Sequence, residues 1–284
     1  LMSLMQEDES LVPMISRILA KMGGSALPEL VQELQTLKES GEEGSNRGIA
    51  VMSLITEIGL SNHEDMKKLF LIQDPELTGM FERIFISKGE PILAPVLEAT
   101  LDEPRIPDLA QGIFSSMRPQ TQNVATKLMH SLKPGDRKKI GLLQVLGLMK
   151  EPSSAQIMYD SLKDPDHEIR MTAIRELGKF GREALEPLTD AMHDKDPHVR
   201  AAAVESLGDI GLPVLDQLIS ALKDSDGNIR AAAITGIAKI GEPAQFMLIQ
   251  SLDDKDRNVR SAVARLLENS GFKPKYTTDR LSFL

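Results

Sequence analysis

The chain has 284 residues and a formal net charge of −9; 41% of its residues are hydrophobic and 4% are aromatic. This apolar fraction excludes a disordered chain, and the scarcity of aromatic residues favours close-packed helices over strands. The chain has no Cys, which excludes disulfides, thiolate catalysis and Cys-ligated metal centres and favours a cytoplasmic location. No apolar run approaches the roughly 18 residues of a membrane span, and the opening LMSLMQEDES has no basic stretch, so neither a membrane segment nor a signal peptide is predicted.

The N-terminal region, residues 1–104, is predicted to form divergent helical repeats with an acidic surface. Its AKMGGSALPELVQEL, from residue 20, resembles AKIGEPAQFMLIQSL, from residue 238, which indicates a shared helical unit. The polar, Gly-rich segment 41–48 predicts a loop insertion between helices. This region holds 18 acidic and 8 basic side chains, so we expect it to attract basic surfaces.

Residues 105–150 reverse that charge, with eight basic and two acidic side chains. One interpretation is a solvated helix face. The other is a contact patch for an acidic protein or a phosphate group, because a clustered positive field attracts such partners. The candidate contact residues of this patch are Lys133, Arg137, Lys138 and Lys139.

From Asp164 onwards a segment of thirty residues recurs. The copies read DPDHEIRMTAIRELGKFG, DKDPHVRAAAVESLGDIG, DSDGNIRAAAITGIAKIG and DKDRNVRSAVARLLENSG. In the second copy Val199, Ala203 and Leu207 share one face of a helix, for which Asp196 is the predicted N-cap and Gly211 the predicted end. A second amphipathic pattern follows over 214–222, so each copy predicts a helix, a tight turn and another helix. We call the helix after the Asp-x-Asp turn the motif helix and the one after it the second helix.

The same spacing continues backwards with lower regularity, which predicts regular repeats over residues 105–271 and about eight to nine helix pairs in all. Residues 272–284 are predicted to be a linker and the start of a further, truncated helix. A thirty-residue helix pair cannot bury its own apolar face and must stack on the next. The predicted fold is therefore an all-α right-handed superhelix, an α-solenoid, with the motif helices outside and the second helices lining a concave groove.

The pattern D-x-D-x-x-V/I-R-x-x-A with L-G-x-x-G resembles the HEAT-like repeats named after phycobilisome lyases, most strongly over residues 134–271. In that family the Asp and Arg of the motif hydrogen-bond along the stack. The resemblance implies a structural role for the corresponding residues here, Asp164 with Arg170, Asp194 with Arg200, Asp224 with Arg230 and Asp254 with Arg260.

No residue is predicted to be catalytic, to bind a cofactor or to bind a metal. The segment HDKDPH, from His193, brings two His and two Asp together, but its histidines occupy positions that vary among the copies. The segment from Asp224 lacks the Gly and the bidentate Glu of a calcium loop. His-Glu pairs do not follow the motif Arg as they do in deoxyhypusine hydroxylase, and phosphate-binding and nucleophile-elbow motifs are missing.

The sequence therefore predicts a non-catalytic scaffold that binds another protein through the groove and the charged faces. Binding to a membrane is not expected, and the net charge argues against nucleic acid. The alternative that the resemblance leaves open is a bilin lyase or bilin chaperone. The predicted contact residues on the second helices are Glu183, Glu186, Asp190, Asp216, Gln217, Ser220, Gln245 and Gln250.

Overall fold

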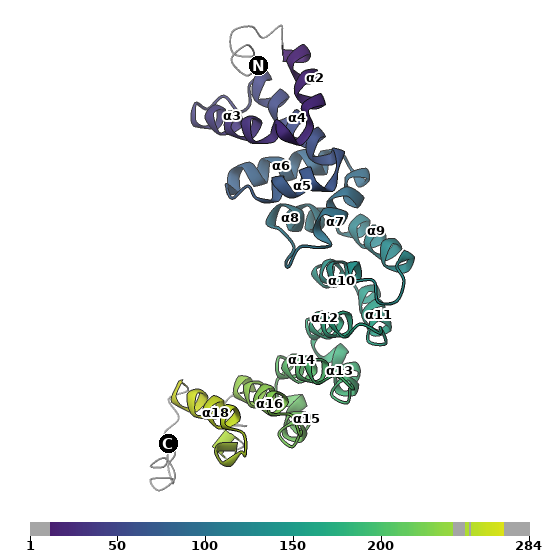
Figure 1. Cartoon of the computed structure of the whole chain (residues 1–284), viewed down its shortest axis with the longest axis vertical. Helices are drawn as coiled ribbons and strands as arrows, with labels where there is room; N and C mark the ends of the chain where they lie inside the picture. Colours follow the sequence, from purple (N-terminus) through teal and green to yellow (C-terminus); the bar gives the residue numbers. More distant parts are fainter. Residues whose placement is uncertain (1–11, 241–247, 250, 270–284) are drawn as a thin grey trace. The chain divides into compact units, whose positions relative to one another are not determined.

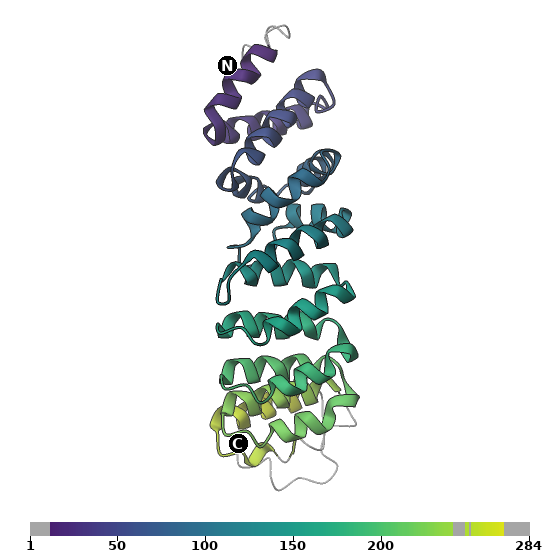
Figure 2. The same cartoon turned by 90° about the vertical axis from the view of Figure 1, so that its right-hand side faces the viewer.

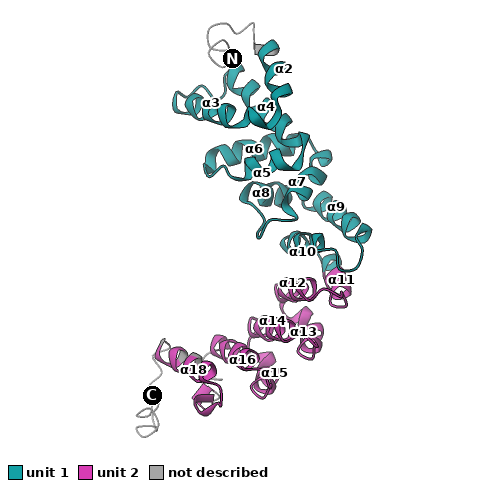
Figure 3. Ribbon diagram, in the orientation of Figure 1, with its two compact units in different colours: residues 1–154 teal, residues 155–284 magenta. Residues whose placement is uncertain are grey.

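The structure is a computed structural model that describes residues 12–240, 248–249 and 251–269. Sixteen α-helices and no strand lie in that part of the chain, which confirms the predicted all-α class (Figure 1). The chain divides into two compact units, residues 1–154 and 155–284 (Figure 3). The predicted change of regularity after residue 104 falls inside the first unit and stays a prediction, as does the handedness of the superhelix. The predicted linker 272–284 lies outside the described residues.

Unit 1 is a stack of helices in two layers. Its elements are α2 (Val12–Met22), η2 (Gly23–Ser25), α3 (Leu27–Glu39), α4 (Asn46–Ser61), α5 (His63–Phe70), α6 (Pro75–Ser87), η3 (Glu90–Ile92), α7 (Leu93–Thr100), α8 (Asp108–Ser116), α9 (Arg118–Ser131) and α10 (Lys138–Met149). The even-numbered helices pack against one another in succession, and α5, α7 and α9 do the same beside them. Phe81, Phe85 and Phe114 are fully buried between these layers.

Unit 2 continues the pattern with shorter second helices. Its elements are α12 (His167–Gly178), η4 (Gly181–Ala184), α13 (Leu185–Ala191), α14 (Pro197–Gly208), η5 (Leu212–Val214), α15 (Leu215–Ala221), α16 (Gly227–Ile240), η7 (Ser251–Asp253) and α18 (Arg257–Asn269). Helix α11 (Pro152–Ser161) begins in unit 1 and ends in unit 2. Seen from the side, the motif helices α12, α14 and α16 lie one above another in a stack (Figure 2).

Helix α14 begins where the sequence predicts, but it ends at Gly208, three residues before the predicted end at Gly211. Asp196 is the N-cap of α14, where its carboxylate accepts the His198 N–H at 2.8 Å, and Pro197 follows in the first turn. Val199, Ala203 and Leu207 are buried on one face of this helix. Gly211 has a φ of 88°, a conformation that costs glycine little and L side chains more, so the chain turns there into the second helix.

The packing in unit 2 corrects the predicted arrangement of its two helix layers. The motif helices approach most closely, because a Cβ added to Gly208 of α14 would lie 2.6 Å from the Gly236 Cα of α16. The second helices α13 and α15 contact each other far less. Close packing on one side and wider spacing on the other bend the stack toward the motif helices, which lie on the inner side of the bend of unit 2 (Figure 1). The second helices of this unit lie outside, contrary to the prediction.

None of the helices in residues 12–240, 248–249 and 251–269 is both long and apolar enough to cross a membrane.

Candidate functional site

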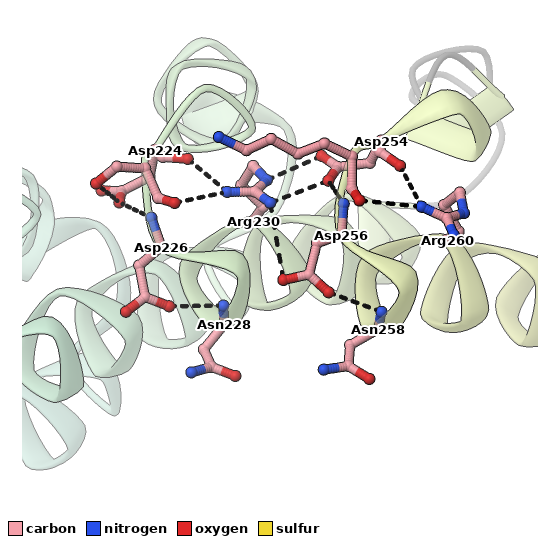
Figure 4. A network of polar contacts seen from close by, with 10 residues as sticks. Asp224, Asp226, Asn228, Arg230, Asp254, Asp256, Asn258 and Arg260 are labelled. Carbon is pink, nitrogen blue, oxygen red and sulfur yellow. Dashed lines mark hydrogen bonds and ion pairs between the residues drawn. The ribbon is translucent and has the colours of Figure 1, made fainter.

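A ladder of ion pairs joins the motif turns of unit 2 (Figure 4). Arg230 donates from Nε and Nη2 to the two carboxylate oxygens of Asp254 at 2.8 and 3.0 Å. Its Nη1 donates to the carbonyl oxygens of Asp224 and Ser225 at 2.8 and 3.0 Å. One guanidinium therefore holds the turn of its own copy to the carboxylate of the next copy, in the bidentate geometry that suits Arg.

Each hydrogen-bonded Arg–Asp pair between two copies is one rung of the ladder, and the three rungs differ in geometry and exposure. Arg170 binds Asp194 in the same bidentate way, at 2.9 and 3.0 Å. Arg200 reaches Asp224 with Nε alone, at 3.4 Å. The side chains of Arg170 and Arg230 are 4% exposed, whereas that of Arg200 is 18% exposed. The middle rung is therefore the weakest of the three.

The predicted partners within each copy need a correction. The sequence pairs Asp164 with Arg170, and the later copies likewise, but the carboxylate that accepts hydrogen bonds from each ladder Arg lies 24 residues further along the chain. Arg230 also forms an ion pair with Asp256 of the next copy, at 3.9 Å. Within a copy the Arg donates hydrogen bonds to carbonyl oxygens of the turn, as Arg260 does to those of Asp254 and Lys255 at 2.8 and 3.1 Å. The side-chain pairs therefore connect copies, and the carbonyl bonds hold the turn inside each copy.

The ladder favours the ionised form of Asp194 and of Asp254. Burial alone would raise the pKa of Asp194, but the hydrogen bonds from Arg170 and from the Asp196 N–H outweigh it, and the pKa lies below the ordinary value. Burial opposes ionisation at Asp254 too, where Arg230 and the Asp256 N–H lower the pKa in the same way. These charges are engaged in the stack, which leaves binding to side chains outside the ladder.

A shallow groove, which we call the inner groove, crosses the motif helices α12, α14 and α16. Its floor is made of small or apolar side chains, namely Met171, Ala201, Ala202, Ala231 and Ala232. Its rim carries Arg175, Glu205 and Thr235, which occupy the same position in three successive copies. The frame of the groove is thus regular, and the chemistry along its rim changes from one helix to the next.

The predicted contact residues on the second helices lie away from this groove. Glu183, Glu186, Asp190, Asp216 and Ser220 are exposed and Gln217 is half-buried. They belong to η4, α13 and α15, on the outer side of unit 2. Gln245 and Gln250 lie outside the described residues.

A second hollow lies on this outer side, and Tyr159 of α11, Pro187 and Asp190 of α13 and His193 line it. The Tyr159 hydroxyl donates to the Glu183 carbonyl oxygen at 3.1 Å. Burial, together with the nearby carboxylates of Glu183 and Glu186, raises the pKa of Tyr159, which therefore stays neutral.

The predicted basic patch forms the turn before α10 and its first residues in unit 1. Lys133, Arg137 and Lys138 are exposed and Lys139 is half-buried. The only carboxylate within 133–139 is that of Asp136, which accepts the Lys138 N–H at 3.0 Å. Cations at a helix N-terminus add to the positive end of the helix dipole, so this surface is strongly positive.

The His and Asp of HDKDPH do not converge on a metal site. His193 lines the outer hollow and His198 lines the inner groove, where its ring lies 6.5 Å from that of His167. Asp194 and Asp196 serve the ladder and the helix cap. Across the described residues, no group of three or more His, Asp or Glu side chains could hold a metal ion.

Sequence reasoning missed Arg175, Glu205 and Thr235. A signal was present, since the motif helices carry Ala or Gly at the positions that meet their neighbours, whereas the second helices carry larger side chains. Small residues allow helices to approach, so they mark the inner layer of a curved stack. The variable exposed positions of that layer are then the candidate contact residues.

Comparison with known proteins agrees with the repeat pattern. A family model described as HEAT repeats matches residues 125–207 and 215–282, and one described as the PBS lyase HEAT-like repeat matches residues 199–224. A crystal structure of an engineered protein is 16% identical, with a TM-score of 0.44, over 90% of this chain and 74% of that one. None of the curated proteins matches the chain.

Proposed function

The chain belongs to the HEAT repeat family, and from this premise we propose that it is a non-catalytic scaffold that binds another protein. HEAT repeats generally mediate protein–protein interaction. We propose that the inner groove of unit 2 is the main contact surface and that the basic patch of unit 1, Lys133 with Arg137, Lys138 and Lys139, is a second one.

The observation that carries this proposal is that, within each copy, the residues that hold the stack together are separate from the exposed residues that vary. The turn residues repeat and are engaged in the ladder, as Arg170 and Arg230 are. The rim residues Arg175, Glu205 and Thr235 stand at one repeated position and differ in charge. A fixed frame with one variable side chain per repeat favours recognition, because a preorganised surface loses little entropy on binding.

The basic patch favours an acidic partner surface. Lys133 and Lys138 are exposed, and the first turn of α10 contains no acidic residue. Positive potential at such a site accelerates encounter with an acidic partner and makes binding sensitive to salt.

The test is a pull-down from lysate of the source organism with the full chain as bait. The parent is compared with K133E/K138E and with the control R83E/K88E, which makes the same change of net charge elsewhere in unit 1, also at exposed residues. A protein retained by the parent and the control and lost from K133E/K138E supports the second contact. If the parent retains no protein above the background of an unrelated bait, the scaffold proposal is wrong.

The bilin alternative is tested by a separate absorption measurement, which is read together with the pull-down. The PBS lyase HEAT-like model covers residues 199–224, which is a single repeat, so its name carries no activity to this chain. Free bilin is mixed with the full chain and the absorption spectrum is recorded. A shifted band together with an empty pull-down would favour the alternative, whereas a scaffold should leave the band unchanged.

A further inference from the structure

Two opposite charges in the inner groove have no partner within the described part of the chain. Arg175 on α12 and Glu205 on α14 occupy the same position in successive copies, and both are exposed at the rim. Neither forms an ion pair or a side-chain hydrogen bond with a described residue. The groove therefore offers one cation and one anion, on neighbouring helices, to an external ligand.

Other charges on the same helices are already engaged. Lys179, the C-cap of α12, pairs with Glu176 of that helix, and Lys239 of α16 pairs with Asp209, the C-cap of α14. At the groove itself, the Asp226 carboxylate accepts the Asn228 N–H at 2.8 Å. Arg175 and Glu205, unlike these residues, can form an ion pair with a ligand.

The spacing of the two charges suits an extended chain. The axes of packed helices lie about 8–10 Å apart, and α12 packs closely against α14, because a Cβ added to Gly178 of α12 would lie 2.9 Å from the Ser206 Cβ of α14. A peptide in the extended polyproline II conformation has three residues per turn and rises about 3.1 Å per residue, so residues three apart lie on the same face, about 9 Å from each other. The alanines of the floor, Ala201 and Ala231 among them, leave room for the main chain of such a peptide.

We propose that the inner groove binds an extended segment of a partner protein in which an acidic and a basic residue, three positions apart, contact Arg175 and Glu205. This inference rests on the proposed scaffold function and names the chemistry of the segment that the groove selects. A segment with two like charges at these positions would place one of them against a like charge, which disfavours binding. The charge pattern of the rim is thus the element of specificity.

The test is selection from a displayed library of random nine-residue peptides on the immobilised full chain. The parent should enrich peptides with an acidic and a basic residue three apart. R175E makes both rim charges acidic and should enrich two basic residues, and E205R makes both basic and should enrich two acidic residues. Exposed ion pairs are individually weak, so each change should alter peptide affinity about two- to five-fold in fluorescence polarisation.

The matched controls are R182E and E186R, which exchange one cation and one anion at exposed residues on the outer side of unit 2. They should enrich the same peptides as the parent. The inference is overturned if the parent enriches no charge pattern, or if parent, R175E and E205R enrich the same one. In either case a protein still retained from lysate would leave the scaffold function standing and the groove chemistry refuted.

Discussion

The ladder predicts a graded response to removal of its arginines. In Arg230→Ala the bidentate bonds to Asp254 and two carbonyl bonds are lost, and a carboxylate that is 14% exposed remains without its cation. Breaking a buried ion pair by removing one partner costs about 3–5 kcal/mol. The Asp256 N–H still solvates the Asp254 carboxylate, so we expect the lower end, about 3 kcal/mol.

The middle rung should respond less. Arg200 makes one bond of 3.4 Å to Asp224, and both side chains are nearly one fifth exposed. Partly solvated pairs of this kind contribute about 1 kcal/mol, so Arg200→Ala should destabilise the stack far less than Arg230→Ala. Arg230→Lys keeps the charge and loses the two-pronged guanidinium. It should therefore recover less than half of the stability that is lost in Arg230→Ala.

The assay is native-state hydrogen exchange of the full chain, read by mass spectrometry in peptides from α14, α16 and α18, with urea unfolding beside it. Local exchange is needed because repeats need not unfold in one step. Arg175→Ala, at an exposed residue, is the control and should leave exchange unchanged. Equal effects of Arg200→Ala and Arg230→Ala, or protection unaltered by the latter, would refute the ladder as the source of coupling between copies.

Three further predictions concern charge and packing. The pKa of Asp194 is lowered, so its contribution to stability is present above the ordinary Asp pKa and is lost as pH falls through the lower folded value; Asp194→Asn should flatten thermal melting temperature against pH below about pH 4. Burial raises the pKa of Glu176 more than Lys179 lowers it, so ionisation opposes folding as pH rises; Glu176→Gln should increase the melting temperature at pH 7, and a decrease would contradict this sign. Gly208→Ala would place a Cβ 2.6 Å from the Gly236 Cα, and calorimetry should give a loss of about 1–3 kcal/mol; a neutral result would show that the helices can separate freely.

The sequence was sufficient to predict the repeated unit because the residues at the helix starts and turns each favour one local structure. Asp196 before Pro197 marks the start of α14, and Gly211, three residues after the end of that helix, provides the conformation that the turn needs. Their recurrence every thirty residues defines the stack, and the HEAT repeat model confirms it. Local chemistry and period together therefore suffice for the fold class.

The same period could not identify contacts between copies. A thirty-residue repeat is equally consistent with Arg170 binding Asp164, six residues before it, and Asp194, 24 residues after it. Only the distance between successive turns decides that the carboxylate comes from the next copy. The inner layer was missed for the same reason, since amphipathicity says which face of a helix is buried and not which layer of a stack is the more crowded.

We propose above that unit 2 binds its partner on the motif-helix side. The most direct measurement is site-specific photo-crosslinking in lysate, with a benzophenone amino acid placed at Ala231 in the inner groove or at Ser220 on α15. We expect a crosslinked protein from position 231 that is absent from position 220 and is reduced by R175E and by E205R. Crosslinking from position 220 alone, or equal crosslinking from both positions, would contradict it.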